Sequence, residues 1–427
     1  MPGPTLRPAN VTPTAARSRP RVLVLTGYYL PGHRAGGPVR SISNMVERLG
    51  DEFEFWIVAP DRDFGSDEPY EGVDLTRWTP LGKAQVRYVS PAMARRGAVT
   101  ALAAETEHDL MYLNSFFHPS YTLRPLAARR FAGLRTSRVL VAPRGELGRG
   151  ALRLKALKKR PFIVLGRLTG LYDGVAWHAT APEEQTDIRR LFGPKPRVFV
   201  APNLGSPGFL RPPSAPPPEK RPGAARLVFA SRIMRGKNLA YLVEALGHLR
   251  GDVALDVFGP LQDPAYWEHC EQLAQRLPPN VSMSYRGEVS ADDMPATLDR
   301  YHLFVLPTLA ENFGHAIVEA LGRGLPAVIS DTTPWGEIEA RGAGRVVPLG
   351  DPRRFAEAIQ HFVNLAAPEY DRYRAAARTF GRARIDDADA VEATRQMLAA
   401  NAGAADDGGA SHGTVNDSGA SPGEERG

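Results

Sequence analysis

The chain has 427 residues, 43% apolar and 23% charged, which is an ordinary globular composition at a length above which a single core usually stops growing. The formal net charge of +6 suits an anionic ligand or membrane surface but is too small to indicate nucleic-acid binding. The single cysteine, Cys270, excludes an internal disulfide and a multi-cysteine zinc site. We therefore expect two domains, no nucleic-acid partner and a reducing, cytoplasmic location.

Residues 1–20 contain prolines and arginines without an apolar centre, so they do not resemble a secretory signal. No stretch approaches the ~20 apolar residues that a membrane-spanning helix requires. We expect residues 1–20 to form a disordered leader. We also expect the protein to be soluble, or at most peripheral at the inner face of the membrane.

Short apolar runs alternate with segments long enough for helices throughout residues 21–204. A continuous apolar run is typical of a strand buried on both faces, and strands that alternate with helices form parallel sheets. This region is therefore predicted to be a Rossmann-like α/β domain. Its predicted strands are 21–26, 55–59, 86–89, 110–113, 139–142, 175–179 and 198–201.

Proline becomes frequent in residues 205–224, which favours an extended, semi-rigid linker between domains. The alternation of strands and helices then restarts and continues through 225–369. A helical segment at 370–400 follows, and the segment 401–427 is almost devoid of apolar residues, so it is predicted to be disordered. The predicted strands of the second domain are 227–230, 253–258, 281–285, 303–306, 327–329 and 345–347.

Gly36 and Gly37 follow the first predicted strand and precede a segment, 39–49, that is expected to form a helix. Two residues without a Cβ allow the backbone to approach a ligand closely. A glycine pair is also common in simple turns, so both interpretations stay open at this point.

Arg232 and Lys237 come directly after the predicted strand 227–230, near its carboxyl end. Open α/β sheets bind their ligands at that edge. A planar guanidinium group and a compact ammonium group both suit phosphate oxygens. The pair therefore indicates a phosphate site, with two solvated cations as the alternative.

Glu311 and Glu319 lie between two predicted strands. If one helix held both, they would be about 12 Å apart along its axis and could not share one small substrate atom. Gly314 instead predicts that Glu311 lies in a loop and that a helix begins near His315. Such a helix N-terminus attracts phosphate, which leaves the carboxylates to bind hydroxyl groups. The pattern indicates a nucleotide-sugar site, with a surface helix bearing two solvated glutamates as the alternative.

The segment from Glu311 to Trp335, ENFGHAIVEALGRGLPAVISDTTPW, resembles the donor-site signature of the family 4 (group 1) retaining glycosyltransferases. Residues 231–239 resemble the Arg-x4-Lys element of that family, and residues 35–40 resemble its glycine-rich loop. The three motifs occur in the family's order over most of the chain. The resemblance implies the GT-B fold, in which two Rossmann-like domains with mostly parallel sheets face each other across the active-site cleft and the last helix returns to the first domain.

The resemblance also implies roles for these residues. Glu311 would lie beside the transferred sugar, and Glu319 would hold the ribose hydroxyls. Arg232 and Lys237 would contact the diphosphate and stabilise the departing nucleotide. Further contacts with the nucleotide-sugar are implied for Gly36, Gly37, Asn312, Phe313, Gly314 and His315.

Four polar residues of the first domain are candidates for the sugar and acceptor side of the cleft. Asn114 stands at the end of a strand where many members of the family have a histidine; an amide can bind a sugar hydroxyl but cannot act as a base. His118 follows four residues later, and a loop histidine without a role is the alternative. Arg144 and Glu146 are assigned to the acceptor side by resemblance.

Residues 149–160 include six cations. Leu152, Leu154 and Leu157 do not share one helical face, so the segment is predicted to be a poor amphipathic membrane helix. It is interpreted either as a solvated basic helix or as a patch for an anionic acceptor, such as a lipid-linked diphosphate sugar at the membrane surface.

Asp61 and Asp63 have the D-x-D spacing that some transferases of another fold use to bind a metal, but here they follow a Rossmann-like strand, where a solvated loop is the preferred interpretation. The histidines show no metalloprotease spacing. We predict no metal requirement and no cofactor.

Together these features predict a metal-independent, retaining glycosyltransferase of hexosyltransferase type (EC 2.4). The predicted donor is a nucleoside-diphosphate sugar, and the predicted acceptor is a hydroxyl group of a lipid-linked glycan in exopolysaccharide or lipopolysaccharide synthesis. Two alternatives stay open: a non-catalytic scaffold that binds nucleotide-sugars, and a GT-B epimerase or phosphorylase.

Overall fold

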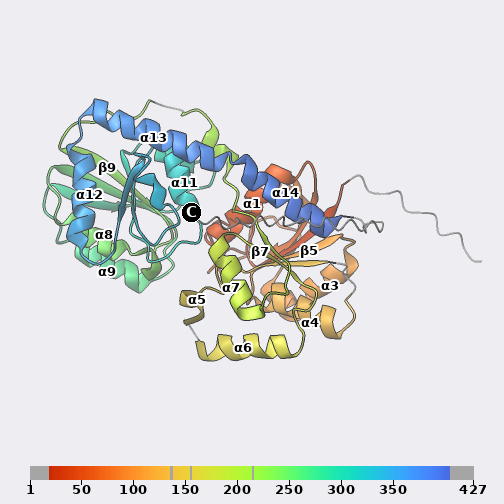
Figure 1. Cartoon of the computed structure of the whole chain (residues 1–427). Helices are drawn as coiled ribbons and strands as arrows, with labels where there is room; N and C mark the ends of the chain where they lie inside the picture. Colours follow the sequence, from red (N-terminus) through yellow and green to blue (C-terminus); the bar gives the residue numbers. More distant parts are fainter. Residues whose placement is uncertain (1–18, 135–137, 154–155, 214–215, 404–427) are drawn as a thin grey trace, which may run out of the picture.

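The computed structural model describes residues 19–134, 138–153, 156–213 and 216–403 (Figure 1). The predicted disordered tail and leader lie outside the described residues, except for positions 19–20 and 401–403. Two sheets, one of eight strands and one of six, each carry helices on their faces. We call the part built on the first sheet the N-terminal lobe and the part built on the second sheet the C-terminal lobe.

The sheet of the N-terminal lobe has the strand order β3-β4-β2-β1-β5-β6-β7-β8. All neighbouring strands are parallel except β3 and β4, which pair antiparallel. The edge strand β3 was not predicted, because its three residues include Pro80 and form no apolar run. The strands are β1 (Arg21–Thr26), β2 (Glu54–Pro60), β3 (Thr79–Leu81), β4 (Ala84–Val89), β5 (Leu110–Asn114), β6 (Val139–Ala142), β7 (Ala176–Ala179) and β8 (Val198–Val200).

Seven α-helices and a short π-helix connect the strands of this lobe among the described residues. They are α1 (Gly37–Leu49), α2 (Pro91–Arg95), α3 (Ala98–Glu105), the π-helix η1 (Pro119–Leu123), α4 (Arg124–Phe131), α5 (Arg149–Arg153), α6 (Ala156–Leu168) and α7 (Pro182–Phe192). The segment 149–160, considered as one helix above, is helical at 149–153 and 156–160, and positions 154–155 lie outside the described residues.

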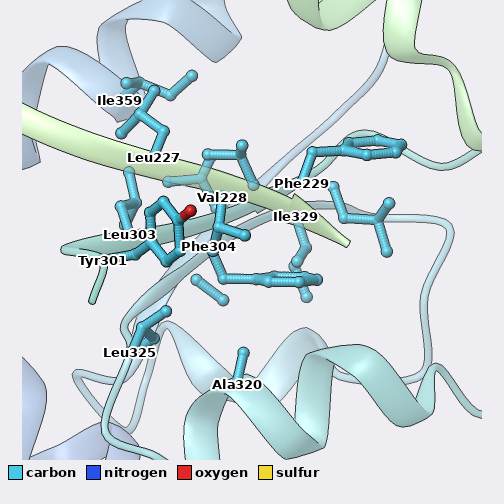
Figure 2. Close-up of a cluster of buried hydrophobic side chains, with 14 of the residues drawn as sticks. Leu227, Val228, Phe229, Tyr301, Leu303, Phe304, Ala320, Leu325, Ile329 and Ile359 are labelled. Carbon is cyan, nitrogen blue, oxygen red and sulfur yellow. The ribbon is translucent and has the colours of Figure 1, made fainter. Parts of the chain in front are cut away.

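The sheet of the C-terminal lobe is wholly parallel, with the order β11-β10-β9-β12-β13-β14. Its central strands are apolar along their length because helices cover both faces. Figure 2 shows Leu227, Phe229, Phe304 and Ala320 among the buried side chains of this core. The strands are β9 (Ala224–Ala230), β10 (Asp252–Phe258), β11 (Val281–Tyr285), β12 (Leu303–Leu306), β13 (Ala327–Ser330) and β14 (Gly344–Val347).

The remaining helices follow the same alternation. A short 3-10 helix, η2, lies in the predicted linker, where Phe209 packs into the core of the C-terminal lobe. The elements are η2 (Pro207–Leu210), η3 (Arg235–Lys237), α8 (Leu239–Leu246), α9 (Pro264–Ala274), α10 (Met294–Leu298), α11 (His315–Gly322), η4 (Gly336–Ile338), α12 (Pro352–Asn364), α13 (Ala367–Ile385) and α14 (Ala388–Ala402).

The segment 370–400, predicted as one helix, forms parts of two helices. The break falls at Asp386 and Asp387, where the Asp387 carboxylate accepts a hydrogen bond of 3.0 Å from the Ala390 N–H and starts α14. Helix α13 packs against α11 of the C-terminal lobe, whereas α14 contacts β5 and places Met397 and Leu398 in the core of the N-terminal lobe (Figure 1). None of the described helices has the length and apolar character needed to cross a membrane.

Candidate functional site

A cavity of about 370 Å³ lies between the two lobes. The carboxyl ends of β1, β6, β9 and β12 lead into its walls, which is where open α/β sheets bind ligands. From the N-terminal lobe it is lined by Gly36, Gly37, Pro38, Arg40, Ser41, Arg144 and Asn203, and from the C-terminal lobe by Ala230, Ser231, Arg232, Lys237, Leu306, Ala310, Glu311, Asn312, Phe313, Gly314, His315 and Ala316.

The loop before α11 has the predicted geometry. Gly314 adopts φ 79° and ψ 55°, a left-handed conformation that favours glycine, and α11 begins at His315. A Cβ at Gly314 would also lie 3.0 Å from Ile317 Cδ1. The Trp335 indole N–H donates to the Phe313 carbonyl and anchors the loop. The first N–H groups of α11 have no partner inside the helix, so a ligand at this end of the cavity can accept their hydrogen bonds.

Lys237 and Glu311 form an ion pair at the cavity wall, with side chains only 13% and 14% exposed. Two hydrogen bonds to the Gly236 carbonyl, from the Leu309 N–H at 2.9 Å and from Thr308 Oγ1 at 3.1 Å, hold the two loops together. The two C-terminal motifs recognised in the sequence therefore meet. An ammonium group lies beside the carboxylate, and both line the cavity.

Arg232 lines this cavity and a smaller adjoining one of about 130 Å³. Burial lowers the pKa of Arg232, and the charges of Glu311 and Tyr28 oppose that shift. The guanidinium group remains protonated at neutral pH, because its reference pKa is above 12. Gly36 lies close to it across the cleft, since a Cβ there would be 3.9 Å from Arg232 Nε. Gly36 itself requires glycine through its φ of 68°.

Glu319 is 2% exposed and forms an ion pair with Arg40 of the N-terminal lobe. The carboxylate atom that faces the Arg40 guanidinium is Oε1. Burial lowers the pKa of Arg40 to about 10, which still leaves it charged at neutral pH. Arg40 is the last residue of the glycine-rich motif at 35–40, and no role was predicted for it. A cation one turn into the helix after that loop was the signal that could have identified it.

His315 lines the cavity as a neutral imidazole. Burial, followed by the charges of Arg40 and Arg144, lowers its pKa to about 3. Its Nε2 atom is buried and has no hydrogen-bond partner among the described residues. A neutral imidazole with one free nitrogen can contact a ligand but is a poor base at neutral pH.

Burial also lowers the pKa of His178 to about 3 and that of His302 to about 4. Unfolding would return these groups and His315 to a pKa of ~6.5, so the unfolded chain binds more protons at every pH between the folded and unfolded values. Stability is therefore expected to fall as pH drops below 6.5, by up to about 1.4 kcal/mol per pH unit for each histidine. Chemical unfolding at pH 7.5, 6.5, 5.5 and 5.0 measures the slope.

The exposed residue His248 provides a control for this pH dependence. His248→Gln is expected to leave the dependence of the unfolding free energy on pH unchanged. His302→Gln is expected to reduce its slope by the contribution of one histidine, up to about 1.4 kcal/mol per pH unit. An unfolding free energy that stays constant from pH 6.5 to 5 would contradict the assignment.

Arg144 is held at the cavity by three hydrogen bonds. Its guanidinium donates to Asn114 Oδ1 at 2.8 Å, to Asn203 Oδ1 at 2.6 Å and to Tyr112 Oη at 2.8 Å. Arg144 has φ 55°, a conformation that is costly for a residue with a side chain and is maintained here by this network. Because Tyr112 Oη accepts from Arg144, its own hydrogen is directed to His178 Nδ1, 2.7 Å away.

The Asn114 side chain therefore forms hydrogen bonds with groups inside the protein. It is 4% exposed, and its amide donates to Thr26 Oγ1 at 3.3 Å and to the Pro38 carbonyl at 3.4 Å. It is absent from the described cavity walls. The contact with a sugar hydroxyl considered above does not fit this placement, and Asn114 instead positions Arg144.

His118 and Glu146 also lie outside the described cavity walls. His118 Nδ1 accepts a hydrogen bond of 3.3 Å from the Tyr121 N–H, and burial lowers the pKa of His118 to about 4. Glu146 accepts from the N–H groups of Phe116 at 2.6 Å and Phe117 at 3.0 Å. Both residues therefore stabilise the loop after β5. The sequence alone could not distinguish this structural role from a role in the cleft.

Further contacts cross between the lobes. Glu288 pairs with His33 at 2.7 Å and with Arg34 at 2.9 Å. Asn312 Nδ2 donates to Thr180 Oγ1 at 3.1 Å. The site is therefore enclosed from both sides. No cluster of three or more potential metal ligands occurs among the described residues.

Comparison with known proteins agrees with this architecture. The family model of glycosyl transferases group 1 matches residues 213–380, which is the C-terminal lobe with most of α13. HepE from Anabaena, solved in complex with UDP and glucose, aligns with a TM-score of 0.64 and 17% identity over 90% of this chain and 100% of its own. No curated protein sequence matches the chain.

Two further solved structures show the same fold. Sucrose-phosphate synthase from Thermosynechococcus elongatus aligns with a TM-score of 0.64 and 17% identity, over 90% of this chain and 100% of its own. WaaG, a glycosyltransferase involved in lipopolysaccharide biosynthesis, aligns with a TM-score of 0.61 and 13% identity, over 90% and 100%. The chain has the GT-B fold, with two mainly parallel α/β sheets facing each other across a cleft.

Proposed function

We propose that the protein is a retaining glycosyltransferase that moves a sugar from a nucleoside-diphosphate sugar to an acceptor hydroxyl. The observation that carries this proposal is the convergence of Arg232, Lys237 and the N-terminus of α11 on one cavity that Glu311 also lines. Two cations and a helix N-terminus match a diphosphate, and a carboxylate beside them matches sugar hydroxyls. The group 1 family match over residues 213–380 supports the same activity.

The principal chemical requirement is to stabilise the charge that develops on the departing diphosphate. Lys237 is held before the donor arrives by its ion pair with Glu311, and Arg232 lines the same cavity. Preorganised charges in a cleft that excludes water stabilise a transition state without reorganisation. The amide groups at the start of α11 add a third source of positive potential.

The carboxylates orient the donor. Glu311 accepts hydrogen bonds from hydroxyls of the transferred sugar, and Glu319 accepts from the ribose. Glu319 lines the smaller adjoining cavity together with Gly36 and Arg40. His315 offers its unpartnered nitrogen to the diphosphate or the sugar.

Retention is proposed to proceed on one face of the sugar. The bond from the anomeric carbon to the diphosphate oxygen breaks, the acceptor oxygen bonds to that carbon on the same face, and the acceptor proton passes to the leaving phosphate. This route is supported by the described residues that line the larger cavity. His315 is neutral with a low pKa, and Glu311, the only carboxylate among those residues, is paired with Lys237.

The acceptor is proposed to be a lipid-linked glycan in the synthesis of a cell-surface polysaccharide, and the reaction to need no added metal. The role of WaaG in lipopolysaccharide biosynthesis supports the first part. Arg232 and Lys237 support the second, because they supply the positive charge that a metal otherwise provides. UDP is the first nucleotide to test, since HepE was solved with it.

A thermal-shift panel of UDP-, GDP- and ADP-sugars tests donor binding. A donor present at a hundred times its dissociation constant is expected to stabilise the fold by about 2.7 kcal/mol. Slow release of free sugar from that donor, without an acceptor, would distinguish an enzyme from a binding scaffold. Conversion of the donor into an epimer, or no shift with any nucleotide-sugar, would contradict the proposal.

A further inference from the structure

Helices α4 and α6 expose an apolar surface on the N-terminal lobe. Eight large apolar side chains are exposed among the described residues, and five of them belong to these two helices. Leu157 is 93% exposed and Leu168 80%, which is unusual for leucine in a helix. The five residues are Phe131 on α4 and Leu157, Val164, Leu165 and Leu168 on α6. We call them, with the exposed Pro161, the apolar face.

The apolar residues of α6 form a single stripe. At about 100° per residue, positions 157, 161, 164, 165 and 168 fall within about 100° of the helix circumference. Ile163 and Gly166 lie on the opposite side of α6, where they are buried against the body of the lobe. The stripe was not predicted from the sequence, because the comparison of Leu152, Leu154 and Leu157 stopped at residue 160. In the structure Leu152 lies on α5 and Leu157 on α6.

The charged residues of α4 and α6 are all positive. The two helices carry seven lysines and arginines and no acidic residue, and Asp173, which follows α6, lies close to Gly170 and Arg130. Lys158 lies at one border of the stripe, and Arg160 and Arg167 lie at the other, all exposed. A helix with a lipid-facing apolar stripe and basic borders fits an anionic bilayer.

A groove of about 410 Å³ between α4 and α6 adds to this surface. It is lined mainly by apolar side chains, including Leu123, Phe131, Phe162 and Leu165. The groove deepens the apolar face beyond what the isolated helix would offer. No described element of the chain covers the five exposed residues.

We propose that α4 and α6 dock this protein onto an anionic lipid bilayer, with the apolar face inserted at the level of the headgroups. The basic borders bind lipid phosphates, and the apolar side chains replace contact with water by contact with acyl chains. Helix α6 runs along the lower edge of the N-terminal lobe in Figure 1, so docking leaves the cleft free to bind its donor.

The docking surface has a consequence that rests on the proposed function. The connection after β6 contains Arg144, which lines the cavity, and five residues later it enters α5, which leads to α6. The same connection therefore joins the cleft to the bilayer surface. A lipid-anchored acceptor would reach the reacting sugar while its anchor stays in the membrane.

Sedimentation with vesicles of phosphatidylcholine alone or with 30% phosphatidylglycerol (roughly the anionic fraction used in such tests) checks the proposal on the full chain without any donor. The protein is expected to bind the anionic vesicles at least about tenfold more strongly than the neutral ones. Leu165→Glu combined with Leu168→Glu is expected to lower that binding by about tenfold or more, because both side chains lie in the stripe.

Charge reversal provides a matched comparison. Lys158→Glu with Arg160→Glu is expected to weaken binding to anionic vesicles, whereas Arg353→Glu with Arg354→Glu, an equal change of charge on exposed positions of α12, is expected to have less effect. Donor stabilisation in the thermal-shift assay should persist in all three double variants, so failure of docking and failure of the proposed function are distinguishable. Equal binding of wild type and the leucine variant would overturn the proposal. A dimer in size-exclusion chromatography that the leucine variant dissociates would also overturn it and would assign the apolar face to a second copy of the chain.

Discussion

Replacement of Lys237 by alanine is expected to lower kcat by about 10²–10³-fold with the matching nucleotide-sugar, the size of effect seen when one preorganised donor to a developing anion is removed. The physical reason is that the Lys237 ammonium lines the cavity where the diphosphate would leave, and its position is fixed by Glu311. Alanine removes the charge and also leaves the Glu311 carboxylate without its partner at the sugar position. Steady-state kinetics at saturating donor measures the loss.

Two controls accompany this variant. Lys195→Ala removes an exposed lysine from the N-terminal lobe and is expected to leave kcat unchanged. Lys237→Arg keeps the charge but changes its shape, so it should retain part of the activity. A turnover for Lys237→Ala within about threefold of wild type would show that the ammonium does not stabilise the leaving group.

Gly381→Ala is expected to destabilise the protein by about 3 kcal/mol. Helices α11 and α13 approach each other so closely that a Cβ at Gly381 would overlap the backbone of Leu321 and Gly322. Backbone atoms cannot yield as a flexible side chain can, so the helices must separate. Since α11 carries the candidate phosphate-binding N-terminus, KM for the donor should rise as well. Chemical unfolding and donor titration measure the two effects.

Gly336→Ala is the control for this substitution. Gly336 is an exposed glycine of η4, and a Cβ there would meet no atom within 4 Å. Its unfolding free energy is expected to stay within about 0.5 kcal/mol of wild type. A Gly381→Ala protein as stable as Gly336→Ala would mean that α11 and α13 have more freedom to separate than their contact suggests.

The strands were largely predictable from the sequence because helices bury both faces of the parallel sheets. Runs such as those of β6 and β12 are therefore apolar throughout and stand out from their surroundings. The edge strand β3 lacks this signal, since one side of an edge strand faces solvent and the strand includes Pro80. The break between α13 and α14 was missed because both helices share one stretch of similar composition, and only the cap at Asp387 separates them.

The candidate site was predictable where one motif fixes both a residue and its local backbone. Gly314 predicted the start of α11, and the position of Lys237 after β9 predicted its place at the cleft. Pairings between distant segments were not predictable, because no local pattern links Arg40 to Glu319 or Asn114 to Arg144. For the same reason, the sequence alone could not show that Asn114 and Glu146 serve internal hydrogen bonds.

Helix α14 is the last described element of the chain, so the N-terminal lobe can be completed only after the C-terminal lobe has been synthesised. The ribosome produces the strands of the N-terminal lobe first, but Met397 and Leu398 of α14 belong to the same apolar cluster as Val22 and Val24 of β1. The apolar surface of the nascent lobe that α14 later covers therefore stays exposed to solvent while the whole C-terminal lobe is being translated. A stop codon that removed α14 would leave this apolar surface permanently exposed. The released polypeptide would then be prone to aggregate, even though its C-terminal lobe is complete.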